Sequence, residues 1–398
     1  MIQLRQLKQE MQDELTGNIL PFWLNKMIDN ERGGFYGRID GKNILHPDAE
    51  KGGILNARIL WTFSAAYRVL GKAEYLEMAT IAKDYILTHF YDHEFGGTYW
   101  SLDADGNPKD TKKQFYALGF MMYGLSEYVR ATGDEEALDY AIRLFETIEE
   151  HSLDVVYNGY IEACTREWGK IDDMRLSELD ANFPKSQNTH LHIIEPYTNL
   201  FRVWKDPRLE RALRNLIDIF TDKILNPETH HLDLFFENDW TRGAGQLESY
   251  GHDIECSWLM HEAALVLGDP EVLRKVEPIV QLVAKASEKG LNPDGSIVHE
   301  ANLDTGHVDD DLHWWVQAEA VVGFYNIYQH FADEAALDKA LRCWQYIKDN
   351  LIDHANGEWY WSRHADGTLN TTDDKAGFWK CPYHNGRMCL EIIERILN

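Results

Sequence analysis

Gly96-Gly97-Thr98-Tyr99 shows the pattern that decides the fold: a glycine turn, then β-branched and aromatic residues. The pattern occurs six times, at Gly33-Gly34-Phe35-Tyr36, Gly96-Gly97-Thr98-Tyr99, Asn158-Gly159-Tyr160-Ile161, His231-Leu232-Asp233-Leu234-Phe235, Asp294-Gly295-Ser296-Ile297-Val298 and Asn356-Gly357-Glu358-Trp359-Tyr360-Trp361. Between residues 34, 97, 159, 232, 295 and 357 the steps are 63, 62, 73, 63 and 62 residues. So steady a period indicates repeated units that bury their apolar faces against their neighbours. Six such units predict a closed ring.

The segments between these turns have helical periodicity. Apolar residues recur at three- and four-residue intervals, as in Ile54, Leu55, Ile59, Leu60 and Phe63. Two helices are expected in each repeat. The first, richer in Gly, Ala, Trp and Tyr, spans 52–70, 113–131, 186–204, 249–268, 311–331 and 381–396, and the more charged second spans 72–90, 134–151, 207–225, 270–288 and 333–352, with 1–28 as its sixth member. The sequence thus predicts an all-α fold, an (α/α)6 barrel of six helical hairpins with short β-hairpin loops at the active-site end.

The composition favours one domain and a small-molecule partner. No Pro/Ser-rich linker or low-complexity run interrupts the 398 residues, so we predict a single domain over 1–398. The formal charge of −27, from 39 basic and 66 acidic residues, would repel phosphate backbones and anionic membranes. We therefore expect neither a nucleic acid nor a membrane as a partner.

The cysteines and the first residues predict where the protein resides. Five cysteines without a Cys-x-x-Cys pair indicate reduced thiols rather than a disulfide scaffold or a thiolate metal site. In the opening stretch 1–10, apolar residues at helical spacing are interrupted by charges, which a signal-peptide core would not contain. We predict a cytoplasmic protein, and a monomer because a closed ring needs no partner for its stability.

The predicted architecture brings distant residues to one cavity. All inner helices run in the same direction, so their N-terminal turns converge on one mouth of the barrel. These turns carry Arg58, Tyr116, His190, His252, Trp314-Trp315 and His384. Two histidines on opposite sides of one carbon can remove a proton from one face and return it to the other. A guanidinium or another histidine can stabilise the enediolate, so the expected product is an epimer and no cofactor is needed.

Four stretches carry a resemblance to a known family. They are Tyr250-Gly251-His252-Asp253-Ile254-Glu255 with Trp258, Asn188-Thr189-His190-Leu191-His192, Trp314-Trp315-Val316-Gln317-Ala318-Glu319 and Lys380-Cys381-Pro382-Tyr383-His384-Asn385-Gly386-Arg387. In order and spacing the chain resembles the N-acylglucosamine 2-epimerase superfamily from about Arg32 to Arg387, and within it the members that act on β-1,4-linked disaccharides. The resemblance implies an (α/α)6 barrel that acts on the reducing-end sugar without a redox cofactor.

The resemblance also implies roles for individual residues. His252 and His384 would form the acid/base pair at C2, His190 and Arg58 would bind the enediolate oxygens, and Glu255 would orient His252. Glu255 follows His252 by three residues, which allows that contact on a helix. The residues expected to hold the sugars are Tyr116, Asn188, Trp314, Trp379 and Glu319.

Two local features qualify these expectations. Pro196 predicts that its helix begins near Glu195 or bends there, which makes His190 the least secure of the implied residues. Adjacent residues on a helix diverge by about 100°, so Trp314 and Trp315 are not both expected to face the cavity, and Trp314 is favoured as the sugar contact.

Other functions stay open at this point. An N-acylglucosamine or mannose-type epimerase or isomerase of the same superfamily fits the same motifs. A glycoside hydrolase would use two carboxylates, for which the candidates are Glu195, Glu255, Glu319, Asp311 and Asp373. A sugar-binding scaffold would show no turnover.

Metal binding is not expected from the sequence. The pairs His190/His192 and His230/His231 lack the four-residue step of a helical metal pair. We interpret Asp309-Asp310-Asp311 as acids that face a helix N-terminus.

Overall fold

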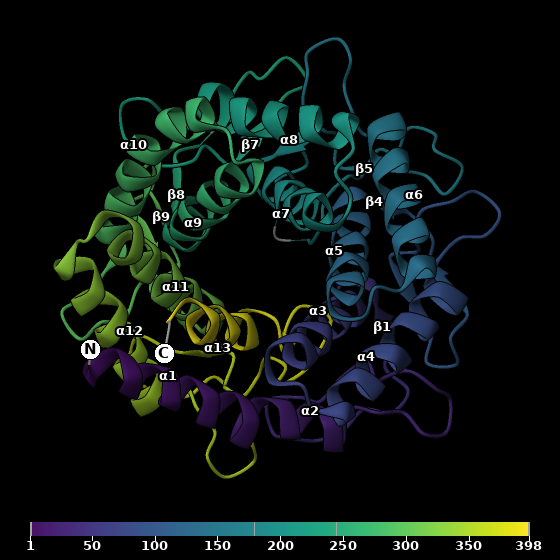
Figure 1. Cartoon of the computed structure of the whole chain (residues 1–398), viewed down its shortest axis with the longest axis horizontal. Coiled ribbons are helices and arrows are strands. Elements are labelled where there is room, and N and C mark those ends of the chain that lie inside the picture. The colour runs from purple at the N-terminus through teal and green to yellow at the C-terminus, as the bar shows by residue number, and fades with distance from the viewer. Residues whose placement is uncertain (1, 179, 244, 397–398) are drawn as a thin grey trace.

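Two concentric rings of helices form the molecule (Figure 1). The computed structural model describes residues 2–178, 180–243 and 245–396. Within them the inner ring consists of α3 (Gly53–Leu70), α5 (Phe115–Thr132), α7 (Gln187–Val203), α9 (Tyr250–Leu267), α11 (Trp314–Phe331) and α13 (His384–Arg395). The outer ring consists of α4 (Ala73–Tyr85) with η2 (Ile86–Phe90), α6 (Glu135–His151), α8 (Pro207–Ile219) with η3 (Phe220–Ile224), α10 (Pro270–Ser287) with η4 (Glu288–Gly290), α12 (Glu334–Asn350), and α1 (Ile2–Glu14), η1 (Leu15–Ile19) and α2 (Leu20–Lys26). The predicted (α/α)6 barrel is confirmed.

The inner helices are the apolar ones because they are covered on both sides. Every residue of α3 from Gly53 to Ala66 is buried, whereas α8 buries one face. Four outer helices, α6, α8, α10 and α12, begin at capping aspartates whose carboxylates accept backbone N–H groups of the first turn. The inner helices start one to three residues later than predicted, and the difference is largest at Trp314 and His384.

The two ends of the chain close the ring. α1 packs beside α13, and the termini lie next to each other in Figure 1. Lys8 Nζ donates a hydrogen bond of 2.8 Å to the carbonyl oxygen of Ile396. The N-terminal stretch therefore acts as the sixth outer helix.

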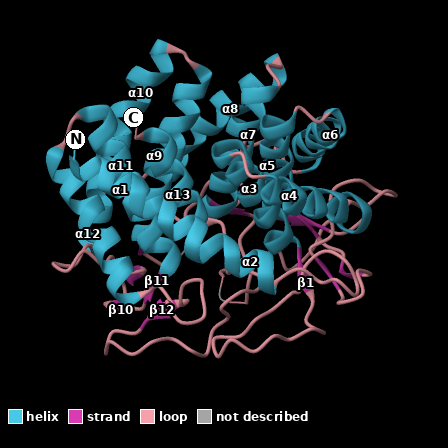
Figure 2. Cartoon of the chain, turned by 60° about the horizontal axis from the view of Figure 1, so that its bottom comes forward, coloured by secondary structure: helices cyan, strands magenta, loops and turns pink. Residues whose placement is uncertain are grey.

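Short strands and loops gather at one end of the barrel (Figure 2). They are β1 (Lys51–Gly52), β2 (Ser101–Leu102), β3 (Pro108–Asp110), β4 (Lys113–Gln114), β5 (Ala163–Cys164), β6 (Lys185–Ser186), β7 (Phe235–Phe236), β8 (Leu247–Ser249), β9 (Glu300–Asn302), β10 (His307–Asp309), β11 (Leu312–His313) and β12 (Ser362–Arg363). The strand that enters an inner helix pairs antiparallel with a strand of the next repeat: β1 with β2, β4 with β5, β6 with β7, β8 with β9 and β11 with β12. A bridge between Ile39 and Ala376 joins the first repeat to the last. The backbone thus links all six repeats around this end.

Buried ion pairs fasten the glycine turns to the inner helices. Asp29 accepts two backbone N–H groups of its turn, from Glu31 and Arg32, and faces Lys51, whose Nζ lies 3.3 Å from Asp29 Oδ2 and 2.8 Å from the Gly33 carbonyl oxygen. The same arrangement recurs at Asp92 with Lys113 and at Asp154 with Lys185, whose lysines donate to the turn carbonyls of Gly96 and Asn158. At Asp353, Lys375 pairs with the carboxylate. Lys51, Lys113 and Lys185 thereby each satisfy a turn carbonyl and a carboxylate that would otherwise lack partners.

Two further features bear on the surroundings of the protein. Among the described residues, no helix has the length and apolar character that crossing a bilayer requires. All five cysteines are free and buried.

The Lys51–Asp29 pair makes a testable prediction about stability. Replacing Lys51 with Met leaves the buried Asp29 carboxylate without its cation, so we expect the free energy of unfolding to fall by about 3–5 kcal/mol in urea denaturation. Lys109→Met is the matched control: Lys109 pairs with Glu50 with side chains 57% and 42% exposed, and its loss should leave the free energy of unfolding nearly unchanged. Equal effects of the two substitutions would contradict the role of the buried pair.

Candidate active site

A cavity of about 280 Å³ opens at the strand end of the barrel, over the first turns of the inner helices. Its wall includes residues from every inner helix and from the intervening loops: Arg58, Tyr116, Leu176, Ser177, Asp180, Asn188, His192, His252, Glu255, His299, His313, Trp314, Trp315, Trp361, Trp379 and His384. Eight of the ten residues singled out from the sequence line this cavity. The two others are Glu319, which lies behind His384, and His190.

His384 is held by a carboxylate from the neighbouring helix. Its Nδ1 lies 2.6 Å from Glu319 Oε1, so Nδ1–H donates to the carboxylate and Nε2 carries the lone pair. Burial lowers the pKa of His384 to about 3 even though Glu319 opposes the shift. His384 is therefore a neutral imidazole with one free basic nitrogen.

His252 is held by a hydroxyl group instead. Its Nδ1 lies 2.8 Å from Ser249 Oγ, at the start of α9. Burial, together with the positive charges that His192, His299 and His384 can carry, lowers the pKa of His252 to about 3. The Trp315 ring is close to both histidines, with centroids 4.9 Å from His252 and 5.7 Å from His384. The two imidazoles thus meet in one cavity although 132 positions separate them in the chain.

Glu255 does not make the contact that its spacing allowed. Its Oε1 accepts a 2.6 Å hydrogen bond from Arg387 Nη2 and lies 4.0 Å from His384 Nδ1, while the polar partner of His252 is Ser249. The expectation that Glu255 orients His252 is therefore replaced: the charge of Arg387 attracts the carboxylate more strongly. Burial and the nearby Glu319 carboxylate raise the pKa of Glu255 well above its usual range, although the charge of Arg387 opposes the shift.

Arg387 organises the floor of the cavity. Its guanidinium donates to Glu195, Glu255 and Glu319, and Glu195 also accepts from the Tyr383 hydroxyl. Although burial opposes it, the charge of Arg387 and the hydrogen bond from His384 lower the pKa of Glu319 to about 2. Glu319 therefore stays ionised beneath His384.

His190 lies outside the cavity, and this corrects its sequence-based position. The side chain is fully buried, its Nε2 accepts the backbone N–H of Tyr160 at 2.9 Å, and its Nδ1 lies 2.7 Å from the Ser186 carbonyl oxygen. Both ring nitrogens are thus used to hold the turn of the third repeat against α7. His190 has no nitrogen left for a sugar.

His192, which sequence reasoning did not select, occupies the place expected for His190. It lines the cavity, and its Nδ1 lies 2.9 Å from Glu195 Oε2, one turn further along α7. Its ring meets the edge of Tyr116 with centroids 4.9 Å apart. The sequence signal was the His192/Glu195 spacing of three residues, the same pattern that drew attention to His252 and Glu255.

Pro196 interrupts hydrogen bonding in α7 without ending the helix. The helix runs from Gln187 to Val203 with Pro196 inside it, so a start near Glu195 is wrong. Proline has no N–H to give to the His192 carbonyl. Gly119 of α5 fits against that oxygen, and a Cβ there would lie 2.4 Å from it. α5 and α7 thus approach closely just below the cavity.

Arg58 presents its guanidinium between aromatic rings. Nη2 donates to the Tyr116 hydroxyl at 3.1 Å, and the guanidinium carbon lies 4.2 Å from the Phe120 ring centroid and 4.7 Å from that of Tyr383. Its Nε is buried without a hydrogen-bond partner. The planar cation is therefore fixed in a site of low polarity, where its N–H groups are strong donors.

Both tryptophans at the start of α11 line the cavity, contrary to the expectation that one would point away. Trp314 packs against Trp361, with centroids 4.5 Å apart, and its Nε1 is buried without a partner. Trp315 stands beside the two histidines. The divergence of about 100° between adjacent side chains is accommodated because the cavity wraps around this end of the helix.

Side chains at the floor of the cavity could bind a metal ion, but the ion would compete with the guanidinium of Arg387. Atoms of Glu255, Glu319 and His384 lie close enough to share an ion. Arg387 Nη2 already lies 2.6 Å and 2.7 Å from the two carboxylates. The guanidinium thus supplies the positive charge at this position, and the absence of a cofactor stays a prediction.

Several known proteins are similar to this chain in both sequence and fold. The N-acylglucosamine 2-epimerase family model matches residues 34–386. A cellobiose 2-epimerase of Bacteroides fragilis is 63% identical over 97% of this chain and 98% of its own, and one of Ruminococcus albus is 42% identical over the same shares. The solved structure of cellobiose 2-epimerase from Bacillus thermoamylovorans superposes with a TM-score of 0.94 at 44% identity, covering 98% of this chain and all of that one. The chain belongs to the N-acylglucosamine 2-epimerase family.

Proposed function

We propose that this protein is a cellobiose 2-epimerase, which interconverts glucose and mannose at the reducing end of β-1,4-linked disaccharides such as cellobiose, lactose or mannobiose. The observation that carries the proposal is the pair of neutral histidines, His252 and His384, on the wall of one cavity. The names of the full-length relatives point to the same reaction.

The proposed chemistry starts with opening of the sugar ring to the aldehyde. One histidine then removes the C2 proton with its free nitrogen, and the other returns a proton to the opposite face of the planar enediolate. The donating histidine has to be protonated, and it takes this proton from solvent, to which the cavity opens. No net proton is consumed, because the first histidine returns the proton that it took from C2 to solvent.

Arg58 and His192 are proposed to stabilise the enediolate. The negative charge develops on O1 and O2, and donors fixed in a dry cavity stabilise such charge without reorganisation. Tyr116 and Asn188, together with the tryptophans Trp314, Trp315, Trp361 and Trp379, are proposed to hold the sugar rings, because aromatic faces pack against the C–H faces of sugars while the amide binds hydroxyls.

The carboxylates argue against a glycoside hydrolase. Glu195, Glu255 and Glu319 all bind Arg387, Asp311 binds His364, and Asp373 binds Asn370. A hydrolase needs two acids that flank the scissile bond. Here five imidazoles line the cavity against two carboxyl groups, Asp180 and the Arg387-bound Glu255, which favours proton transfer at carbon.

The first prediction concerns the reaction itself. Wild-type enzyme incubated with cellobiose in D₂O should give glucosyl-mannose with deuterium at C2 and no free glucose, as read by NMR. His252→Asn and His384→Asn should each lower turnover at least about 100-fold while the far-UV CD spectrum is kept, because each removes one acid/base group. Release of glucose, or wild-type turnover in either variant, would overturn the assignment.

A second prediction separates His192 from His190 with the same substitution. His192→Asn should lower kcat about 100-fold, since it removes a donor to the enediolate. His190→Asn should leave kcat of the folded enzyme within about threefold and lower the free energy of unfolding by about 1–3 kcal/mol, because it unpairs the buried Tyr160 amide. A larger loss of kcat in His190→Asn than in His192→Asn would instead assign the catalytic role to His190.

A third prediction follows from the lowered pKa values. A base acts only when it is unprotonated, so lowering the pKa of His252 and His384 from 6.5 to about 3 moves the acid limb of the rate profile to lower pH. We expect kcat/KM for cellobiose to stay nearly constant from pH 7 down to about pH 5. CD spectra recorded at each pH control for unfolding. A fall in kcat/KM centred near pH 6.5 would contradict the buried, neutral state.

A further inference from the structure

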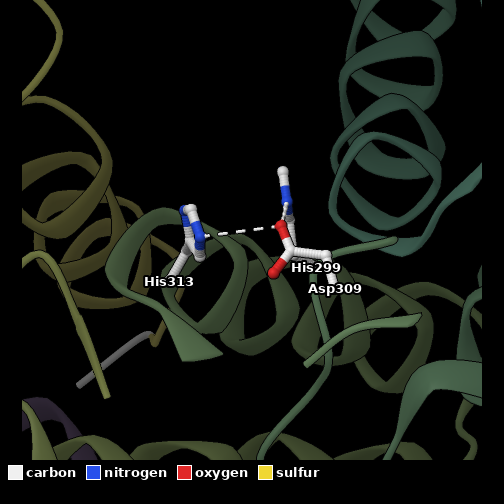
Figure 3. A group of neighbouring side chains, drawn as sticks. All are labelled: His299, Asp309 and His313. Atoms are coloured by element: carbon white, nitrogen blue, oxygen red, sulfur yellow. Dashed lines mark hydrogen bonds and ion pairs between the residues drawn. The ribbon is translucent and has the colours of Figure 1, made fainter. Parts of the chain in front are cut away.

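A second group of polar side chains lies at the rim of the cavity, apart from the acid/base pair. It consists of His299, just before β9, Asp309 at the end of β10, and His313 at the end of β11 (Figure 3). His299 Nδ1 lies 2.7 Å from Asp309 Oδ2, and His313 Nε2 lies 4.0 Å from the same oxygen. All three side chains are half-buried, at 20%, 35% and 16% exposure. We call this group the rim triad.

The rim triad is not explained by the helix N-terminus that Asp309-Asp310-Asp311 was expected to face. No side chain caps α11, and Asp309 and Asp311 turn to histidines instead, to His299 and His364. The His313 imidazole has no hydrogen bond of its own among the described residues; it stacks on His299, and its Nε2 lies 4.0 Å from Asp309 Oδ2. A mostly buried imidazole directed at a carboxylate without bonding it has a lone pair to offer.

We propose that the rim triad binds one Zn²⁺ ion through His299 Nδ1, Asp309 and His313 Nε2. Two imidazoles and a carboxylate are a ligand set that zinc takes in proteins, with water completing four-coordination. The three ligand atoms already lie within 4.8 Å of one another. Ligands about 2.0–2.2 Å from one ion lie about 3.4 Å apart, so the three atoms need to approach one another by roughly 1 Å. The sequence did not predict this site because its ligands come from three strands and show no helical spacing.

Binding requires one rearrangement of the rings. The two imidazoles stack face to face, with centroids 4.4 Å apart and planes 13° apart. An ion has to lie in the plane of each ring that binds it, so one ring has to tilt out of the stack. His299 also has to give up its hydrogen bond to Asp309, whose carboxylate then binds the metal.

The position of the site gives the ion a consequence for the enzyme. His299 and His313 both line the cavity, and the His299 ring lies 5.7 Å from Trp315, which stands beside His252. A bound ion would tie the β9–β10 hairpin to the strand that enters α11 and occupy part of the entrance. The site is therefore inhibitory, and turnover should fall when zinc binds and recover with EDTA.

The test is titration of ZnCl₂ into the EDTA-treated, dialysed whole protein by isothermal titration calorimetry. We expect one equivalent of Zn²⁺ to bind and no comparable binding of Mg²⁺, which prefers oxygen ligands. Asp309→Asn removes the ionised ligand that bridges the two histidines and should weaken zinc binding at least tenfold. Asp310→Asn is the matched control, because Asp310 is the exposed neighbour outside the triad and its loss should change affinity less than twofold.

The outcomes separate this proposal from the proposed reaction. Calorimetry measures binding whether or not the protein epimerises cellobiose. Failure of the wild-type protein to bind zinc overturns the site, and so does equal affinity of wild type and Asp309→Asn, which would place the ion elsewhere, for example on Glu255, Glu319 and His384. Stronger zinc inhibition of wild type than of Asp309→Asn would support it.

Discussion

The active site depends on one buried cation, the guanidinium of Arg387. Three carboxylates, Glu195, Glu255 and Glu319, converge on it in the interior of the barrel. Without this charge the three acids could not lie so close together, because like charges in a low-dielectric site raise one another's pKa until they protonate. Two of these carboxylates in turn hold a histidine, Glu195 holding His192 and Glu319 holding His384. The orientation of two imidazoles therefore depends on a residue that does not line the cavity.

The repeated arrangement of strands, turns and inner helices explains how residues from the whole chain come together in one site. Each repeat contributes the first turn of an inner helix, and the strand before that turn is paired with the next repeat. Inside three of the repeats a buried lysine joins the glycine turn to the start of the inner helix. The position of one catalytic side chain is thus coupled to its neighbours around the ring, which places Arg58 and His384 in the same cavity although 326 positions separate them.

The sequence predicted the architecture more fully than the contacts within the site. The spacing of the turns is enough to predict six hairpins, and it also places Arg58, His252 and His384 correctly because each lies in the first turns of an inner helix. The spacing of the turns did not predict correctly that His190 lies outside the cavity. Two residues along a helix rotate the side chain by about 200°, so the distance from a turn does not determine which of His190 and His192 faces inward. For Glu255, the three-residue spacing allowed two partners, and the charge of Arg387, which comes from another helix, decided between them. Such choices depend on tertiary packing and leave no local pattern.

Burial of the Arg387 cluster costs desolvation energy, and it also shifts the pKa values of the groups in the cluster. Buried ion pairs recover little more than their desolvation energy, so the Arg387 cluster contributes little net stability, and the barrel is stabilised mainly by apolar packing between its rings. What burial supplies instead is a separation of pKa values: that of Glu319 is lowered to about 2, that of Glu255 is raised, and that of His384 is lowered to about 3 within one connected group. In water these groups would all titrate within a few pH units of one another. The closed barrel thus holds carboxyl groups and an imidazole with widely separated pKa values side by side, which suits the proposed transfer of a proton at a sugar carbon.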